Sequence, residues 1–142
     1  MIVLDTNVIS ETMRSRPDPS VLAWLDERKA AGLFVTTITE AEIRFGIARM
    51  DQGKRRDGLA AAAEQAFETL FRGRVLPFDR DAARDYAAIA AHRFAIGRPI
   101  SQFDCQIAAI ARSRGAAVAT RNVQDFAETG LELVNPWEGQ SL

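Results

Sequence analysis

Met1-Ile2-Val3-Leu4-Asp5-Thr6-Asn7 opens the sequence as an apolar run that ends at a carboxylate. Such a run is typical of a strand buried on both faces, as in the middle of a parallel sheet. Open α/β sheets bind their ligands where these strands end, which makes Asp5 a candidate site residue. Because an acid in this position can also simply cap a helix, the decision depends on which other acids reach the same place.

Strand-like runs recur along the chain and alternate with helical patterns. Apolar residues repeat at helical spacing in residues 43–50, 59–71 and 82–96, whereas residues 51–58 form a polar stretch that we expect to be a loop. This alternation predicts an α/β fold with a mostly parallel sheet covered by helices. The expected strands are residues 2–4, 33–36, 74–78, 117–119 and 131–134.

The composition is that of an ordinary globular protein. The chain has 142 residues, 47% hydrophobic and 26% charged, and its formal net charge of −1 gives no basic signature for nucleic acid. We expect a single domain over residues 1–142, with the residues from Gly139 onward frayed. No apolar run has the length of a membrane span or the form of a secretion signal, so we expect a cytoplasmic protein.

A single histidine and a single cysteine limit the chemistry. His92 lies in a helical stretch and is expected at the surface, and Cys105 is expected as a small core residue. This composition excludes a His–Cys zinc cluster, a Ser–His–Asp arrangement and an internal disulfide. Any hydrolytic chemistry would therefore rest on carboxylates.

Two further acids occupy predicted helix starts. Thr39 to Glu42 fits a capping box with Thr39 as N-cap, and Ser101 to Asp104 fits a second one. The helix dipole favours an anion in the first turn, which suits both acids. The helix of Glu42 would follow the strand 33–36, so its first turn would lie over the strand ends, as Asp5 does.

A third strand is followed by an acid within one helical turn. Thr120-Arg121-Asn122-Val123-Gln124-Asp125 leaves the strand 117–119, with Asn122 as the expected N-cap and Asp125 three residues later. Asp79 also follows a strand, and we interpret it as a plain N-cap. An acid that follows a strand is therefore not by itself a catalytic signal.

Several carboxylates brought to one spot would repel one another unless a cation neutralised them. Hard oxygen ligands select Mg²⁺ or Mn²⁺ over zinc. A cation of this kind can accept phosphate oxygens, activate a water and stabilise the charge that develops on a phosphodiester as it is cut. An acid-based, histidine-poor site therefore indicates phosphoryl chemistry.

Taken in order, a series of short strings resembles the PIN-domain ribonucleases, and among them the VapC/FitB-type toxins of bacterial type II toxin–antitoxin systems. The resemblance extends over nearly the whole chain, and its specificity lies in the order and spacing of the strings. They are Leu4-Asp5-Thr6-Asn7-Val8-Ile9-Ser10-Glu11, Thr39-Glu40-Ala41-Glu42-Ile43-Arg44-Phe45-Gly46-Ile47, Leu76-Pro77-Phe78-Asp79, Asp104-Cys105-Gln106-Ile107-Ala108-Ala109, Ala119-Thr120-Arg121-Asn122, Asp125-Phe126 and Asn135-Pro136-Trp137.

The resemblance implies a three-layer α/β/α domain with a central, mostly parallel sheet of about five strands and an acidic pocket. It implies a Mg²⁺- or Mn²⁺-dependent endoribonuclease in which Asp5 and Asp104 are the principal metal ligands and Glu42 is the third acid. The fourth acidic place falls on Asn122, or on Asp125 three residues later, and both alternatives stay open. The hydroxyl of Thr120 would orient an acid or a phosphate.

The resemblance also implies partners. These are an RNA substrate, a second copy of the toxin in a homodimer, and a small DNA-binding antitoxin of the VapB/FitA type, through which the complex would reach operator DNA. Arginine side chains would hold the RNA, and the sequence does not rank them. The candidates are Arg14, Arg16, Arg44, Arg49 and Arg121.

Two alternatives belong to other functional classes. A catalytically silent PIN module that binds RNA or a protein is compatible with Asn122 at the fourth acidic place and with the low net charge. A phosphatase with Asp5 as nucleophile is disfavoured, because such enzymes usually place a second aspartate two residues later, where this chain has Asn7.

Overall fold

The computed structural model describes residues 1–139, so the predicted fraying of residues 140–142 lies outside the described part of the chain. A five-stranded sheet forms its centre, with every neighbouring pair parallel and the strand order β3-β2-β1-β4-β5. This confirms the predicted α/β fold and the expected number of strands. The strands are β1 (Ile2–Leu4), β2 (Leu33–Thr36), β3 (Val75–Leu76), β4 (Ala117–Ala119) and β5 (Leu133–Val134).

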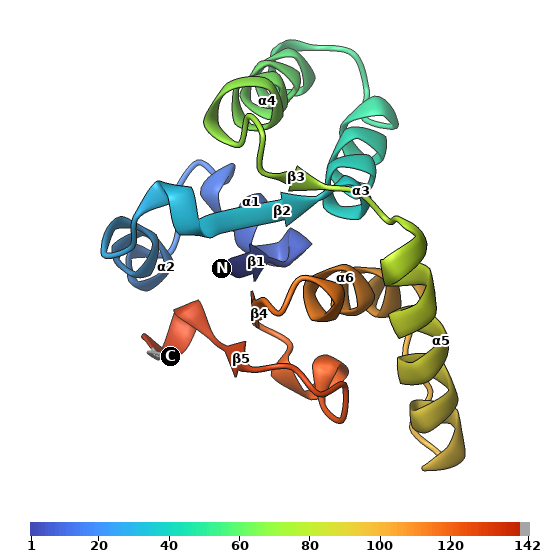
Figure 1. The fold of residues 1–142 in the computed structure, drawn as a ribbon. Coiled ribbons are helices and arrows are strands. Elements are labelled where there is room, and N and C mark those ends of the chain that lie inside the picture. The colour runs from blue at the N-terminus through green and yellow to red at the C-terminus, as the bar shows by residue number, and fades with distance from the viewer. Residues whose placement is uncertain (140–142) are drawn as a thin grey trace.

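Helices lie on both faces of this sheet, so the molecule has three layers (Figure 1). The long α5 forms one side of the molecule (Figure 1). The helices are α1 (Thr6–Thr12), α2 (Pro19–Asp26), α3 (Thr37–Ala48), α4 (Lys54–Glu64), α5 (Arg80–Ala95) and α6 (Gln102–Ser113). Short turns complete the described chain: η1 (Ala30–Gly32), the π-helical η2 (Gln65–Leu70), η3 (Val123–Phe126) and η4 (Pro136–Glu138).

Successive side chains along a strand point to opposite faces of the sheet, so each face has its own hydrophobic core. Val3 and Val118 pack with the apolar residues of α5 and α6, whereas Leu4 and Ala119 pack with those of α1, α2, α3 and α4. The register pairs Val3 with Val118 and Leu4 with Ala119, so neighbouring strands present matching residues to the same face. Burial on both faces explains why the opening strand is apolar throughout.

The strand order fixes where a site can form. The chain proceeds from β1 outward through β2 to β3, and then returns to the other side of β1 with β4 and β5. The order therefore reverses between β1 and β4, and ligands of open α/β sheets bind at the carboxyl ends of strands at such a point. Asp5 directly follows β1, and Thr120 directly follows β4.

Two predicted helix boundaries are wrong. The helix α4 begins at Lys54, inside the predicted loop 51–58, because the polar residues there form the exposed face of a helix. The helix α3 begins at Thr37 with Thr36 as its N-cap, and the Thr36 hydroxyl accepts the Thr39 backbone N–H at 3.1 Å. Thr39 is therefore not the N-cap, and Glu42 lies in the second turn rather than at the third helical position.

The caps predicted for Asp79 and Ser101 are confirmed. The Asp79 carboxylate accepts the Ala82 N–H at 3.0 Å, and the Ser101 hydroxyl accepts the Asp104 N–H at 3.2 Å. Within residues 1–139, no helix combines the length and the apolar character needed to cross a bilayer.

Candidate active site

Asp5 is a buried carboxylate at the end of the central strand. Its backbone N–H continues the sheet by donating to Ala119 O at 2.9 Å, and its side chain is the N-cap of α1. One carboxylate oxygen accepts the Thr6 N–H at 2.8 Å, and the other accepts the Thr120 hydroxyl at 2.8 Å. With the residue only 5% exposed, these two donors fix the orientation of the carboxylate.

The surroundings of Asp5 favour its neutral form. Burial raises its pKa to about 6, and the hydrogen bonds from Thr120 and Thr6 lower it only in part. The negative charges of Asp104 and Glu42 add to the rise. A positive charge close to this carboxyl group would lower its pKa and favour the ionised form.

Glu42 reaches the same place from α3, one turn later than the sequence predicted. The Thr6 hydroxyl donates to Glu42 Oε1 at 2.8 Å, and the Thr39 hydroxyl lies 3.0 Å from the Thr6 hydroxyl. Burial raises the pKa of Glu42, the bond from Thr6 lowers it, and the charge of Asp104 raises it further. Thr6 thus joins the carboxylates of Asp5 and Glu42 through its backbone N–H and its hydroxyl.

Asp104 contributes the third carboxylate from the first turn of α6. Burial raises its pKa, the Ser101 hydrogen bond lowers it, the charge of Asp125 raises it and the charge of Arg93 lowers it. Arg93 is itself buried and donates to the backbone oxygens of Asp125 and Ala127 at 3.0 and 2.8 Å. This guanidinium ties α5 to the turn that carries Asp125.

The two candidates for the fourth acidic place, Asn122 and Asp125, differ in position. Asn122 lines the pocket, and its N–H donates to the Thr120 hydroxyl at 3.0 Å. Asp125 is exposed and is not among the residues that line the pocket, although its charge acts on Asp104. Of the two partners expected for the Thr120 hydroxyl, an acid or a phosphate, the structure shows an acid, since this hydroxyl donates to Asp5.

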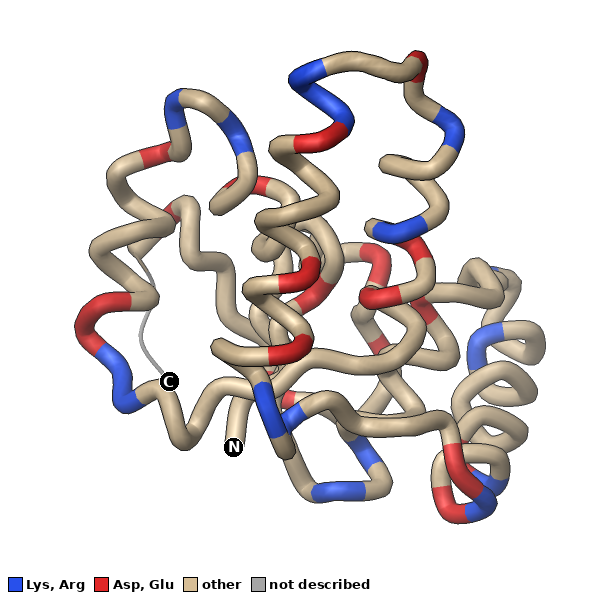
Figure 2. Tube along the Cα trace, turned by 90° about the horizontal axis from the view of Figure 1, so that it is seen from above, with Lys and Arg blue, Asp and Glu red and all other residues tan. Residues whose placement is uncertain are grey.

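These side chains surround one pocket of about 430 Å³. Four acidic residues and two arginines, Arg14 and Arg121, are among the residues that line it. Figure 2 shows basic and acidic positions interspersed over the described chain, with several Asp and Glu positions near the middle of the view. The lining residues are Asp5, Thr6, Asn7, Ser10, Glu11, Arg14, Glu42, Asp104, Arg121, Asn122 and Trp137.

The five arginines proposed as RNA contacts differ in position. Arg14 reaches the pocket while donating to the buried Glu11 at 3.2 Å, and Arg121 lies over Trp137. Arg44 is bound instead by Glu40 at 2.8 Å and Glu64 at 2.5 Å. The other two, Arg16 and Arg49, are exposed and do not line this pocket.

Thr6, Glu11 and Trp137 were not assigned from the sequence, although each lies in a string that carried the resemblance. The hydroxyl of Thr6, directly after Asp5, was a usable signal, because a strand end with two adjacent polar residues can bind two partners. Glu11 gave no such signal, since a glutamate at the end of a helix is usually solvated.

The oxygen-rich lining fits a hard divalent cation. Asp5, Glu42 and Asp104 would hold it, because the charge of Asp104 raises the pKa of both Asp5 and Glu42 and a shared positive charge would offset this repulsion. In residues 1–139, no three His, Cys, Asp or Glu side chains lie close enough together to hold a metal ion among themselves. Mg²⁺ is usually held by one or two carboxylates and keeps several of its waters.

Cys105 and His92 play no part in this pocket, as expected. Cys105 is buried in the core, its thiol contacts Tyr86 O at 3.7 Å, and burial raises its pKa to about 11. A thiol with this pKa is a poor nucleophile. His92 is exposed on α5, with its Nε2 3.4 Å from a Glu128 oxygen.

Comparison with known proteins gives a consistent result. The PIN domain model matches residues 2–131. VapC ribonuclease Y4jK of Sinorhizobium fredii is 47% identical over 138 residues, which cover 97% of this chain and 99% of the relative. Toxin FitB of Neisseria gonorrhoeae is 41% identical over 137 residues, which cover 96% and 99%.

Solved structures agree with the sequence relatives. The structure of FitAB bound to an IR36 DNA fragment superposes with a TM-score of 0.91 at 41% identity, and the match covers 96% of each chain. The fold, the matched length and the level of identity all point to the same group. The chain belongs to the PIN-domain family, within the group that contains the VapC ribonucleases and the FitB toxin.

Proposed function

We propose that this protein is a Mg²⁺- or Mn²⁺-dependent endoribonuclease that acts as the toxin of a toxin–antitoxin pair. One observation carries the proposal: Asp5, Glu42 and Asp104, which are far apart in the sequence, line a single pocket, where the charge of Asp104 adds to the raised pKa of the other two. The similar proteins named VapC ribonuclease and Toxin FitB support the same activity.

The acids and the polar residues around them have distinct roles in this proposal. A divalent cation bound by the carboxylates would supply a polarised water and neutralise charge on the phosphate. Thr6 and Thr120 hold the Asp5 carboxylate in one orientation, so little reorganisation accompanies binding. Glu42 has a raised pKa and can accept a proton from the attacking water. Asn122 would orient a water through its amide.

The partners follow from the same proposal. The similar FitAB structure contains DNA. With a net charge of −1, this chain would reach operator DNA through a VapB/FitA-like antitoxin rather than by its own surface. We propose a cytoplasmic homodimer that is held inactive by the antitoxin.

RNA cleavage tests the activity directly. Purified protein is incubated with RNA and Mg²⁺ or Mn²⁺, with and without EDTA, and compared with the Asp104→Asn variant. We expect cleavage by the wild type, none in EDTA, and a loss of about 100-fold or more in the variant, since metal-based stabilisation is worth several kcal/mol. Undiminished cleavage by the variant or in EDTA would refute the proposal.

One observation favours a second candidate, a catalytically silent module that only binds RNA or a protein. Asn122 stands at the fourth acidic place, and Asp125 lies outside the pocket lining. This candidate predicts partner binding without growth arrest when the chain is expressed alone. Growth arrest that disappears with Asp5→Asn decides in favour of the nuclease.

A further inference from the structure

Trp137 lines the same pocket as the acids, and none of the roles assigned above uses it. It lies in η4 and packs partly against the core cluster on the α1–α4 side of the sheet. The other tryptophan, Trp24, is 2% exposed and belongs to that core. Trp137 differs because part of its surface faces the pocket, where an aromatic ring has no role in holding a cation.

Arg121 extends this aromatic surface. Its guanidinium carbon lies 5.2 Å from the centre of the Trp137 ring. The backbone around the pair is tethered: Arg121 N–H donates to Asn7 Oδ1 at 3.4 Å, and Trp137 N–H donates to Asn135 Oδ1 at 2.9 Å. Asn135 in turn donates to Arg121 O at 3.5 Å. Groups that are already ordered lose little conformational freedom when a ligand binds.

The charged residues that line the pocket do not favour the phosphate backbone of RNA, so an RNA strand needs another source of affinity here. Its lining contains four acids, Asp5, Glu11, Glu42 and Asp104, but only two arginines, Arg14 and Arg121. One of these arginines is already bound by an acid, since Arg14 pairs with Glu11. An RNA strand would therefore gain little from electrostatics here without the cation.

We propose that Trp137 and Arg121 form a stacking subsite for a nucleobase adjacent to the phosphate that is cut. Bases of single-stranded RNA stack on aromatic rings and on arginine planes, and this stacking tolerates any base. The subsite would place the strand over the acids without reading its sequence. The inference rests on the proposed function for the meaning of the acids, but base binding can be measured separately from cleavage.

The direct test compares RNA strands with and without a base. Full-length Asp104→Asn protein in EDTA, which leaves the RNA intact, is titrated with a fluorescent single-stranded oligonucleotide and followed by anisotropy. The same strand is then used with an abasic ribose at one position at a time. We expect one abasic position to weaken binding by about 5- to 100-fold, the value of one stacked base.

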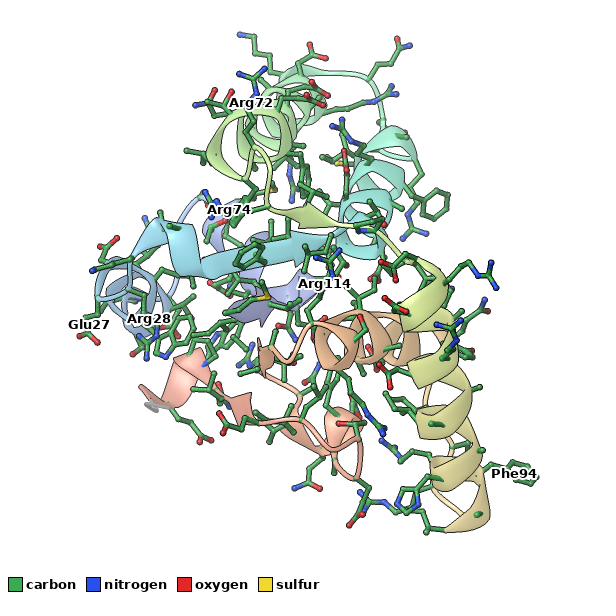
Figure 3. All side chains as sticks on the ribbon, in the orientation of Figure 1. Glu27, Arg28, Arg72, Arg74, Phe94 and Arg114 are labelled. Atoms are coloured by element: carbon green, nitrogen blue, oxygen red, sulfur yellow. The ribbon has the colours of Figure 1, made fainter. Side chains whose placement is uncertain are left out.

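Substitutions locate the effect on the ring. Trp137→Leu should weaken binding of the intact strand by the same factor and abolish the penalty of the abasic position, whereas Trp137→Phe should retain part of both. Phe94→Leu is the matched control, because Phe94 is 80% exposed and projects from α5 into solvent (Figure 3). In the active protein, Trp137→Leu should raise KM more than it lowers kcat.

Tryptophan emission gives a readout that does not depend on any variant folding. With Trp24 in the core, RNA-dependent quenching of wild-type fluorescence reports on Trp137. We expect saturable quenching by the intact strand and less by the abasic one. Equal affinity and equal quenching for both strands, or no saturable binding, would overturn the subsite. Cleavage by the wild type together with that result would overturn the subsite alone, whereas base-dependent binding without cleavage would overturn only the nuclease.

Discussion

Asp5 and Asp79 have the same local structure and different surroundings. Each follows a strand of the sheet, and each caps the helix that comes next. Asp5 is buried beside two other acids, whereas Asp79 is half-exposed and lies 3.8 Å from a guanidinium nitrogen of Arg114. The local sequence pattern of an acid after a strand therefore does not distinguish a site residue from a helix cap.

The difference arises from the order of the strands. β1 lies in the middle of the sheet, so the end of β4 and the start of α3 both come close to Asp5. β3 is an edge strand with a single neighbour, and Asp79 pairs with the cation Arg114 and does not line the pocket of the three acids. Position in the sheet, rather than the strand–acid pattern, thus makes a carboxylate part of a pocket.

The largest expected effect concerns cleavage. Asp5→Asn keeps an oxygen for the Thr6 N–H but removes the charge, and we expect RNA cleavage to fall by about 100-fold or more. Asp79→Asn, the matched control, should leave the cleavage rate unchanged, because Asn caps helices as well as Asp does. Initial rates at saturating Mg²⁺ measure both. Equal losses in the two variants would show that the comparison has no functional meaning.

Asp5→Asn, which should lose cleavage, should gain stability when no metal is present. Because the pKa of Asp5 rises from 3.8 to about 6, the folded state binds more protons than the unfolded state between these values. Stability is therefore lost as the pH rises through this window. Asp5→Asn should be more stable than the wild type at pH 7 in EDTA, by about 1–3 kcal/mol, since each pKa unit is worth about 1.4 kcal/mol.

Urea unfolding at several pH values checks this gain. The advantage of Asp5→Asn should shrink as the pH falls from about 7 to about 4, where the wild-type carboxyl group is protonated. Added Mg²⁺ should stabilise the wild type more than the variant. A wild type that is more stable than Asp5→Asn in EDTA at pH 7 would mean that burial does not raise the pKa of the Asp5 carboxyl group.

Removal of the helix cap at Asp79 should lower stability without changing RNA cleavage. Asp79→Ala loses the bond to the Ala82 N–H, and we expect a stability cost of about 1 kcal/mol with cleavage per folded molecule unchanged. Thermal unfolding and cleavage rates, measured on the same preparation, separate the two effects. A defect in cleavage without a change in stability would give Asp79 a role that its position does not support.

The smallest effect is expected at the exposed acid. Asp125 acts on Asp104 only through its charge, so Asp125→Asn should change Mn²⁺ affinity by less than about tenfold. Calorimetric titration of Mn²⁺ measures this. A loss as large as that of Asp104→Asn would make Asp125 a direct ligand, which is one of the two alternatives that the resemblance left open for the fourth acidic place.

The sequence was sufficient to predict the parallel sheet and to select Asp5, Glu42 and Asp104 as acids that lie near one another. The expected ranges of β1, β2 and β4 match the structure residue for residue, since short apolar runs between polar ends leave few alternatives. The expected ranges of β3 and β5 were longer than the observed strands, because strand ends without a neighbour to pair with are irregular.

The helix starts and the contacts between segments were harder to predict from the sequence. Thr36, Thr37 and Thr39 can all cap a helix, so the local pattern could not choose Thr36 as the cap of α3. The bonds that shape the pocket join Thr6 to Glu42 and Asp5 to Thr120, residues 36 and 115 positions apart. Such contacts depend on how the layers pack, which periodicity does not encode.

Binding of Mn²⁺ by isothermal calorimetry, in the absence of RNA, tests most directly whether Asp5, Glu42 and Asp104 form one cation site. We predict saturable binding to the wild type and to Asp79→Asn with the same affinity, and a loss of about 100-fold or more in Asp5→Asn. Equal Mn²⁺ affinity in Asp5→Asn and in the wild type would contradict the assignment of this pocket as the metal site.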